Sequence, residues 1–408
     1  MKRALAAVLL LAAASSAHAG GLARPNGVSA RGVGLGGAFT AIADDPTAWY
    51  SNPAGAAWGE DGFAIGGEIV YAPRKYVPVD AAGTRGAAQT ATAFAPLPTL
   101  GVTVHPKVDG APSRLALGAA IFNSFGGQLH YPKMSDPGIR AVNSTTDLVF
   151  EVGAGAAYEV DDTFAIGGTV RLGVGVFAVD ANSLPLDADL SGAGVGISAA
   201  LGAMFRPTPQ LTIGASWRAG MDVATSGSGT VGTMGTLNMK HVQKWPQIAS
   251  LGVAVGTATK LRVTAQLDWT QWSRFDRLAI EFPDNPTLKQ TLDFDWKDNW
   301  TARGGVEYAL SKGAVRAGGY FDTSAVPDRT IERQYLDSDK IGVAVGGSLR
   351  VGAWRFDGAL DYTLPGTRTV PDNRPDFSAA SWAAQANIAP GEHSGSVLTL
   401  ELAAFRRI

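Results

Sequence analysis

Cysteine is absent from this 408-residue chain, histidine occurs five times, and only 17% of the residues are charged. Without cysteine the chain forms no disulfide bonds, so an exported protein of this sequence needs another source of stability. The formal net charge of −2 gives no basic surface for nucleic acid. Beyond the N-terminal segment the histidines lie in no HExxH pattern and beside no evident nucleophile. The sequence therefore predicts no catalytic residue, no metal site and no cofactor; those histidines are His105, His130, His241 and His393.

Long apolar runs are also scarce. One such run, Ala4 to Ala14, follows Lys2 and Arg3 and leads to an Ala17-His18-Ala19 cleavage pattern. This arrangement predicts a secretory signal peptide over residues 1–19. The alternative is a membrane-anchor helix, which needs about 20 apolar residues. Since no later run is long enough for a spanning helix, the mature chain is expected to be a soluble exported protein or a closed membrane barrel.

Glycine is abundant, with 51 residues, and most of the chain alternates between apolar and polar side chains. The segments 261–269 and 354–362 show this period of two clearly, and aromatic residues lie at the strand ends. Short connections between strands alternate with long ones. The long connections include 74–93, 221–244 and 273–296. The connection 179–188 should also be long by this rule, but it is only moderate in length. Short periplasmic turns and long outer loops are typical of outer-membrane barrels, and a secreted β-sandwich has no reason to keep this asymmetry. The sequence thus predicts an all-β fold in which residues 61–408 form a transmembrane antiparallel β-barrel of about 14 strands.

Charged side chains fall on the faces of these strands that point into the barrel. One interpretation is an ionic network that braces the lumen, since lumen faces are polar. The other is that one or two arginines hold a substrate carboxylate through a bidentate pair of hydrogen bonds. The candidate carboxylate partners are Arg171, Arg218, Arg262 and Arg303.

Residues 20–60 do not alternate and are rich in glycine, as in Gly34-Leu35-Gly36-Gly37. A phosphate-binding loop would require a following Gly-Lys-Ser/Thr, which is missing. A compact segment ahead of a wide barrel is better interpreted as a plug, or hatch, inside the lumen. Within it, Asp44-Asp45-Pro46 is expected to form a turn rather than a metal site.

Several short motifs occur in a fixed order along the chain. Their collinearity resembles the FadL/TodX (OmpP1) family of outer-membrane transporters for long-chain fatty acids and hydrocarbons, in which Asn-Pro-Ala is the hatch motif. The matching segments are 24–26, 34–39, 43–45, Asn52-Pro53-Ala54-Gly55, 269–276, 296–300, 315–320, 323–328 and 336–339.

This resemblance implies a location in the outer membrane of a Gram-negative bacterium and passive uptake of hydrophobic compounds. Substrate would be captured in a lumen pocket and released sideways through an opening at a kink in the third strand. The expected partners are a hydrophobic small molecule, outer-membrane lipids and the barrel-assembly machinery, and we expect a monomer. The kink maps to Phe122, Asn123, Ser124, Phe125 and Gly126, which could otherwise be an ordinary strand end.

Two features depart from the family pattern. The chain ends in Phe405-Arg406-Arg407-Ile408, whereas the family usually ends in an aromatic residue that the assembly machinery reads. The 179–188 connection is short where relatives often carry a helical loop that forms a surface groove. Other functions compatible with the pattern are a porin for polar solutes and a surface adhesin or receptor. On the family reading, we expect Asn52, Pro53 and Ala54 to anchor the hatch beside the third-strand opening and to gate release.

Overall fold

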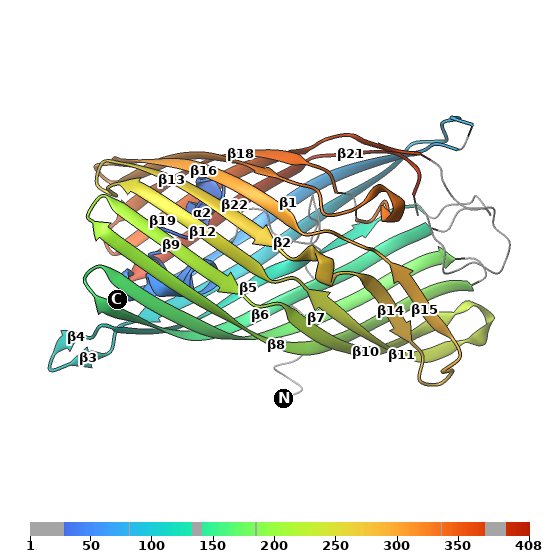
Figure 1. The fold of residues 1–408 in the computed structure, drawn as a ribbon, viewed down its shortest axis with the longest axis horizontal. Helices are drawn as coiled ribbons and strands as arrows, with labels where there is room; N and C mark the ends of the chain where they lie inside the picture. The colour runs from blue at the N-terminus through green and yellow to red at the C-terminus, as the bar shows by residue number, and fades with distance from the viewer. Residues whose placement is uncertain (1–27, 81, 133–140, 184–185, 336, 372–388) are drawn as a thin grey trace.

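The computed structural model describes residues 28–80, 82–132, 141–183, 186–335, 337–371 and 389–408, so the predicted signal peptide and residues 20–27 lie outside the described part. The described chain forms a closed antiparallel barrel of fourteen wall positions, which confirms the predicted fold class (Figure 1). The first six wall strands are β1 (Gly62–Pro78), β2 (Gln89–Val104), β5 (Leu115–His130), β6 (Ala141–Asp161), β7 (Phe164–Ser183) and β8 (Leu186–Thr208).

Several of the next wall positions are built from two strands in series. The shorter strands are β9 (Leu211–Arg218), β10 (Met221–Val231), β11 (Thr236–Trp245), β12 (Ile248–Gly256), β13 (Leu261–Thr270), β14 (Arg277–Glu281), β15 (Lys289–Asp293) and β16 (Asn299–Leu310). The wall then continues through β17 (Gly313–Asp322), β18 (Lys340–Val351), β19 (Trp354–Pro365), β20 (Arg368–Val370), β21 (Gly391–Gly395) and β22 (Val397–Arg407). Pairing of β22 with both β19 and β1 closes the barrel.

Burial alternates along the wall strands, with apolar side chains on the outer surface. Ile197 is 73% exposed and Val170 is 65% exposed, while Arg171 and Ser198 beside them are buried. An apolar outer face and a polar inner face are what a barrel in lipid requires.

The predicted long loop at 221–244 is wrong. It is a hairpin in which β10 and β11 pair from Met221↔Trp245 to Thr230↔Thr236. The 273–296 connection likewise contains the β14–β15 hairpin, and β7 pairs with β8 as far as Ser183↔Leu186. The wall therefore continues as paired strands beyond the apolar band. In this part most of the outward side chains are polar, so the alternation of apolar and polar residues from which the strands were predicted is lost.

At the opposite end the connections are tight turns, with one exception. Between β2 and β5 a small hairpin, β3 (Lys107–Val108) and β4 (Ala111–Pro112), projects beyond the wall (Figure 1). Asp109 and Gly110 form its tip with φ of 52° and 82°, the backbone geometry of a two-residue hairpin turn.

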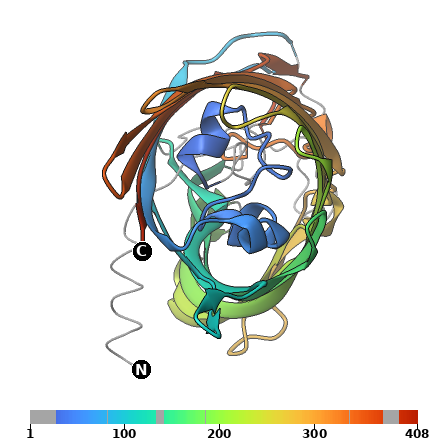
Figure 2. The ribbon, with the colours of Figure 1, turned by 90° about the vertical axis from the view of Figure 1, so that its left-hand side faces the viewer.

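Residues 28–60, called here the lumen segment, lie inside the barrel (Figure 2). They form α2 (Ala30–Gly34), α3 (Ala48–Ser51) and the 3-10 helix η1 (Pro53–Trp58), and nearly all of their side chains are buried. No helix in the described ranges is both long enough and apolar enough to span a membrane.

Glycine lets the lumen segment approach the wall closely. Gly36 has φ of 64°, and a Cβ atom there would lie 2.5 Å from the backbone nitrogen of Gly319 on β17. A Cβ on the neighbouring Gly318 would lie 2.2 Å from the carbonyl carbon of Leu35. The Gly34–Gly37 run thus places backbone against backbone, which a side chain on either partner would prevent.

Candidate functional site

The seam between β2 and β5 is incompletely paired. Their ladder contains five residue pairs, from Leu100↔Ile121 to Val104↔Leu117. By contrast, β2 pairs with β1 over fifteen residues and β5 pairs with β6 over fifteen residues. Beyond Leu100 and Ile121 the two strands therefore continue along other neighbours without pairing to each other. Pairing between the two strands thus stops at Ile121, next to Phe122, where the kink in the third strand was predicted to begin.

A β-bulge lies at this point in β5. The register with β6 shifts between Asn123 and Phe125, so that Ser124 is the extra residue. The Asn123 amide donates to the carbonyl oxygens of Phe125 (3.2 Å) and Val149 (2.9 Å), which satisfies acceptors that the shift disturbs. Just after it, Gly126 has φ of 117°, a conformation that favours glycine. The predicted kink is thus a built irregularity within a long strand, and not a strand end.

Two prolines accompany the open part of the seam on β2. Pro96 and Pro98 pair with Ile69 and Gly67 of β1, so the β1–β2 ladder continues past both prolines. A proline has no N–H, and a strand tolerates it where the nitrogen faces an unpaired edge. We infer that both proline nitrogens face β5, where they remove two donors that would otherwise extend the seam.

The lumen segment meets the bulge through aromatic and cationic contacts. The ring of Tyr50 packs edge-to-face on Phe122, with centroids 4.9 Å apart. The Arg218 guanidinium lies 3.8 Å from the Tyr50 ring centroid and donates to the hydroxyl of Ser124 at 2.9 Å. The bulged residue is therefore connected to the lumen segment through one arginine.

Trp49 fixes the same segment to the closed part of the seam. Its indole N–H lies 3.0 Å from both the Val102 carbonyl oxygen and the Thr103 hydroxyl on β2. Across the seam, a Cβ on Gly118 of β5 would lie 2.3 Å from the same indole nitrogen. Trp49 and Tyr50 thus contact the seam on either side of the point where pairing stops.

The Asn52-Pro53-Ala54 corner lies elsewhere on the wall. The Asn52 amide donates to the carbonyl oxygens of Thr40 (2.9 Å) and of Ala203 on β8 (3.2 Å), and its Oδ1 accepts from the N–H of Ala54. The expectation that Asn52 lies beside the third strand is therefore wrong, because the segment turns after Tyr50 and carries Asn52 towards β8. Asn52 anchors the corner, and Tyr50 contacts the bulge.

Replacement of Asn52 by alanine should loosen this corner. The side chain is fully buried and provides three hydrogen bonds, so its loss should cost about 1–3 kcal/mol. The thermal midpoint of the folded, fast-migrating band in detergent gels measures this cost. Gln210→Ala, in an exposed turn, is the control and should change the midpoint little. Equal midpoints for both variants would show that Asn52 does not anchor the segment.

Arg171 and Arg218 come together on one carboxylate. Glu151 of β6 accepts from Arg171 at 2.6 Å and from Arg218 at 3.2 Å, and its side chain is only 1% exposed. Arg171 also donates to the hydroxyl of Ser198 and to two backbone carbonyls. Glu151 is a residue that sequence reasoning missed, although a glutamate between the apolar runs 148–150 and 152–157 was a usable signal.

Arg303 and Arg262 lie on other parts of the wall. Arg303 pairs with Asp268 at 2.5 Å. Arg262 pairs with Glu307 at 2.6 Å, and Glu307 also accepts from Arg316 at 2.6 Å. All four candidate arginines are thus already bonded to a wall carboxylate.

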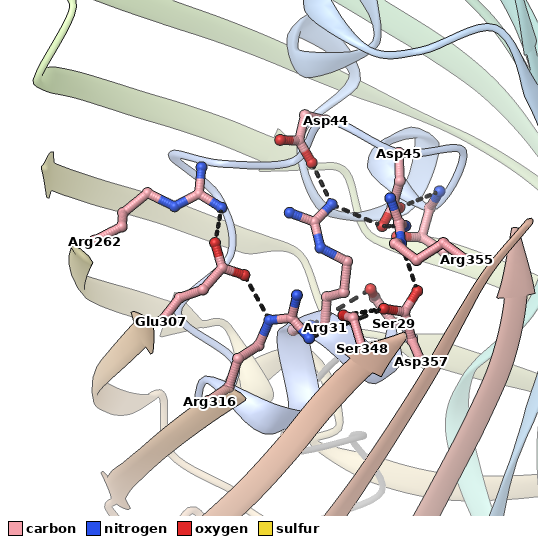
Figure 3. Close-up of polar contacts among 12 residues, drawn as sticks. Ser29, Arg31, Asp44, Asp45, Arg262, Glu307, Arg316, Ser348, Arg355 and Asp357 are labelled. Atoms are coloured by element: carbon pink, nitrogen blue, oxygen red, sulfur yellow. Dashed lines mark hydrogen bonds and ion pairs between the residues drawn. The ribbon is translucent and has the colours of Figure 1, made fainter. Parts of the chain in front are cut away.

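A second ionic network joins the lumen segment to the wall around Arg31 (Figure 3). Arg31 forms ion pairs with Asp44 and, at 3.3 Å, with Asp45. Asp45 also pairs with Arg355 of β19 at 3.3 Å. Burial opposes the charge of Asp44, but the guanidiniums of Arg31 and Arg262 outweigh it and hold the pKa of that carboxyl well below its usual range. Both aspartates therefore serve as anchors for the segment. Asp45 Oδ1 also accepts from the Thr47 N–H at 3.0 Å, which forms the expected turn around Pro46.

Aromatic side chains gather on the side of the lumen segment that faces the β10–β11 and β14–β15 hairpins. We call this group the aromatic cluster; it consists of Phe125, Trp245, Trp272, Phe275, Phe294, Trp296 and Tyr335. Phe275 lies at its centre, 4.6 Å from Trp296 and 5.0 Å from Phe294 between ring centroids. Phe125, from the bulge, stacks on Trp245 at 5.4 Å. The cluster is thus continuous with the open seam.

A cavity of about 80 Å³ separates the aromatic cluster from the lumen segment. Its lining includes Tyr50, Trp272, Arg218 and Arg303, so two of the candidate arginines face it. Arg262 instead borders a cavity of about 560 Å³ near the turns that precede β7, β9 and β13. Across the described ranges, no group of three or more histidine, aspartate or glutamate side chains could hold a metal ion.

Comparison with known proteins gives one family. The family described as outer membrane protein transport protein (OMPP1/FadL/TodX) matches residues 10–363. No curated protein sequence matches the chain.

Solved structures share the fold. A Pseudomonas aeruginosa FadL homologue superposes with a TM-score of 0.80 at 16% identity, covering 95% of this chain and 99% of that one. The Ralstonia pickettii toluene transporter TbuX gives 0.70 at 18% identity, covering 94% and 99%. The P. putida toluene transporter TodX gives 0.66 at 16% identity, again covering 94% and 99%.

Proposed function

Since the chain belongs to the OMPP1/FadL/TodX family of outer-membrane transport proteins, and is therefore an outer-membrane barrel of a Gram-negative cell, we propose that it admits a hydrophobic compound by lateral release. In this proposal the aromatic cluster captures the molecule from outside, and the open β2–β5 seam releases it into the membrane. The lumen segment acts as a hatch that blocks the direct route to the periplasm. The protein works passively and as a monomer.

The incomplete seam carries this proposal. A hydrophobic molecule in an aqueous pore would have to leave its apolar surroundings, whereas an opening in the wall leads directly into lipid. Phe125 belongs both to the bulge and to the aromatic cluster, so one side chain lies at the inner mouth of the opening and on the capture surface. Arg218, the cation that contacts the bulge, is held by Glu151 and Ser124 and so presents no unpaired charge at this opening.

Restoring the missing donors on β2 tests the proposal. Pro96→Val combined with Pro98→Val adds two N–H groups, which favours a paired seam by about 1–3 kcal/mol. Uptake of a hydrophobic probe by cells should then fall at least about fivefold. Pro112→Val, in the exposed β4, is the matched control and should transport as the wild type does.

Surface abundance and heat-modifiable migration show that the variants are assembled. If the double variant transports normally at equal abundance, the seam is not the exit. If the wild-type protein instead admits polar sugars into liposomes, the porin alternative replaces lateral release.

A further inference from the structure

Two indole N–H groups in the aromatic cluster have no hydrogen-bond partner. Trp245 is fully buried and Trp296 is 3% exposed, and in the described residues neither indole nitrogen contacts an acceptor. Buried tryptophans normally satisfy this donor. Trp49 does so at Val102, and Trp217 on the outer wall does so at Gln247 (2.9 Å). The cluster therefore offers two directional donors in otherwise apolar surroundings.

Four cationic side chains near the cluster are already paired. Arg274, which follows Trp272, bonds to Asp222 at 2.6 Å, and Lys244, beside Trp245, bonds to Asp276 at 3.3 Å. Arg329 pairs with Asp295 at 2.7 Å. Arg218, below the cluster, is held by Glu151 at 3.2 Å. A carboxylate that entered the cluster beside any of these four would thus have to take the cation from an existing partner.

The local field also disfavours an anion. Burial raises the pKa of the Tyr335 phenol well above its usual value, and the carboxylates of Asp147 and Glu332 act in the same direction. Because Tyr335 packs on Phe294 and Trp296, at 5.4 and 5.9 Å, these carboxylates act on the cluster itself. A second negative charge placed there would be both desolvated and repelled.

We propose that the aromatic cluster selects uncharged hydrophobic molecules that carry a hydrogen-bond acceptor, such as a ketone, ester or hydroxyl oxygen, through the indole N–H groups of Trp245 and Trp296. The inference rests on the proposed function, since it takes the cluster as the capture site, and it narrows the substrate class. An acceptor oxygen satisfies a buried donor that a pure hydrocarbon leaves unpaired, and a neutral ligand avoids the cost of burying an anion.

Three small probes distinguish the possibilities when their binding to the purified full-length protein in detergent is measured by calorimetry. Acetophenone and α-methylstyrene have nearly the same shape, but only the ketone offers a carbonyl acceptor, and benzoate supplies a carboxylate. The wild type should bind acetophenone about threefold to tenfold more tightly than α-methylstyrene, the difference expected for one hydrogen bond, and should bind benzoate most weakly.

The ratio of ketone to hydrocarbon affinity is then compared among variants, so that any loss of packing cancels. Trp245→Phe combined with Trp296→Phe should bring the ratio to about one while α-methylstyrene still binds. Trp217→Phe should keep the wild-type ratio, because its indole lies on the outer wall. An unchanged ratio in the double variant, or tightest binding of benzoate, would overturn the inference and leave lateral transport standing. Failure of all three probes to bind would instead overturn capture by the cluster.

Discussion

Deleting residues 28–60 should raise the single-channel conductance of the protein in planar bilayers, on the order of tenfold, because a barrel of fourteen wall positions has a wide interior once its filling is removed. The wild-type lumen is filled by α2, α3 and η1, whose side chains are almost all buried. Ions therefore have no broad aqueous path in the intact protein. The measurement is the distribution of conductance steps for the two proteins at one salt concentration.

The deletion also removes Arg31 and Asp45, which neutralise charges on the wall, so assembly has to be checked. Heat-modifiable migration should persist, because the strand ladder does not pass through the deleted residues. Asn52→Ala serves as an intermediate control that loosens the segment without removing it. Identical conductance for the wild type and an assembled deletion variant would show that the segment is no hatch.

Glu151→Leu should be the most damaging single substitution in the wall. It leaves Arg171 and Arg218, both nearly fully buried, without their shared carboxylate. Breaking a buried ion pair by removing one partner costs about 3–5 kcal/mol, and here two guanidiniums lose the same partner. The unfolding midpoint in urea, followed by the folded band in gels, should fall markedly.

An exposed ion pair near the same strand gives the matched control. Asp162 lies in the turn after β6, and its side chain is 90% exposed and 3.3 Å from Arg114. Asp162→Ala should change the free energy of unfolding by less than about 1 kcal/mol. Glu151→Leu combined with Arg171→Leu should recover part of the loss, since one unpaired charge disappears with its partner. Equal stability of Glu151→Leu and Asp162→Ala would mean that water reaches the arginines and the network is not buried.

The barrel could be predicted from the sequence because lipid imposes a simple rule on every wall strand. A side chain at each second position faces hydrocarbon, so segments such as 261–269 alternate whatever their partners are. Above the apolar band this constraint ends, and the β10–β11 hairpin was taken for a loop. Its pairing depends on neighbours distant in sequence, which alternation alone does not reveal.

The candidate site was only partly visible in the sequence. Gly126 and the polar residues before it indicated the irregularity in β5. The period of two gave no sign of the role that we infer for Pro96 and Pro98 on the facing strand, because that role depends on which neighbour their nitrogens face. The arginines were identified from their position on inner faces, yet their partners were not. Which carboxylate meets which guanidinium depends on the register of the barrel. Glu151 on β6 becomes the partner of both Arg171 on β7 and Arg218 on β9 only when the pairing from β6 through β7 and β8 to β9 is set.

The closing pair of the wall has a consequence for the order of assembly. β22 pairs with β1 from Gly62↔Arg407 to Tyr71↔Leu398, and β1 begins where the chain leaves the interior. If the cylinder sealed first, a folded segment with two helices and a buried ionic network would have to thread into a finished tube. Enclosure during sealing avoids that step. Contacts such as Arg31 to Asp45 to Arg355 join the earliest part of the described chain to one of the last wall strands, so they can form only once β19 lies beside the lumen segment.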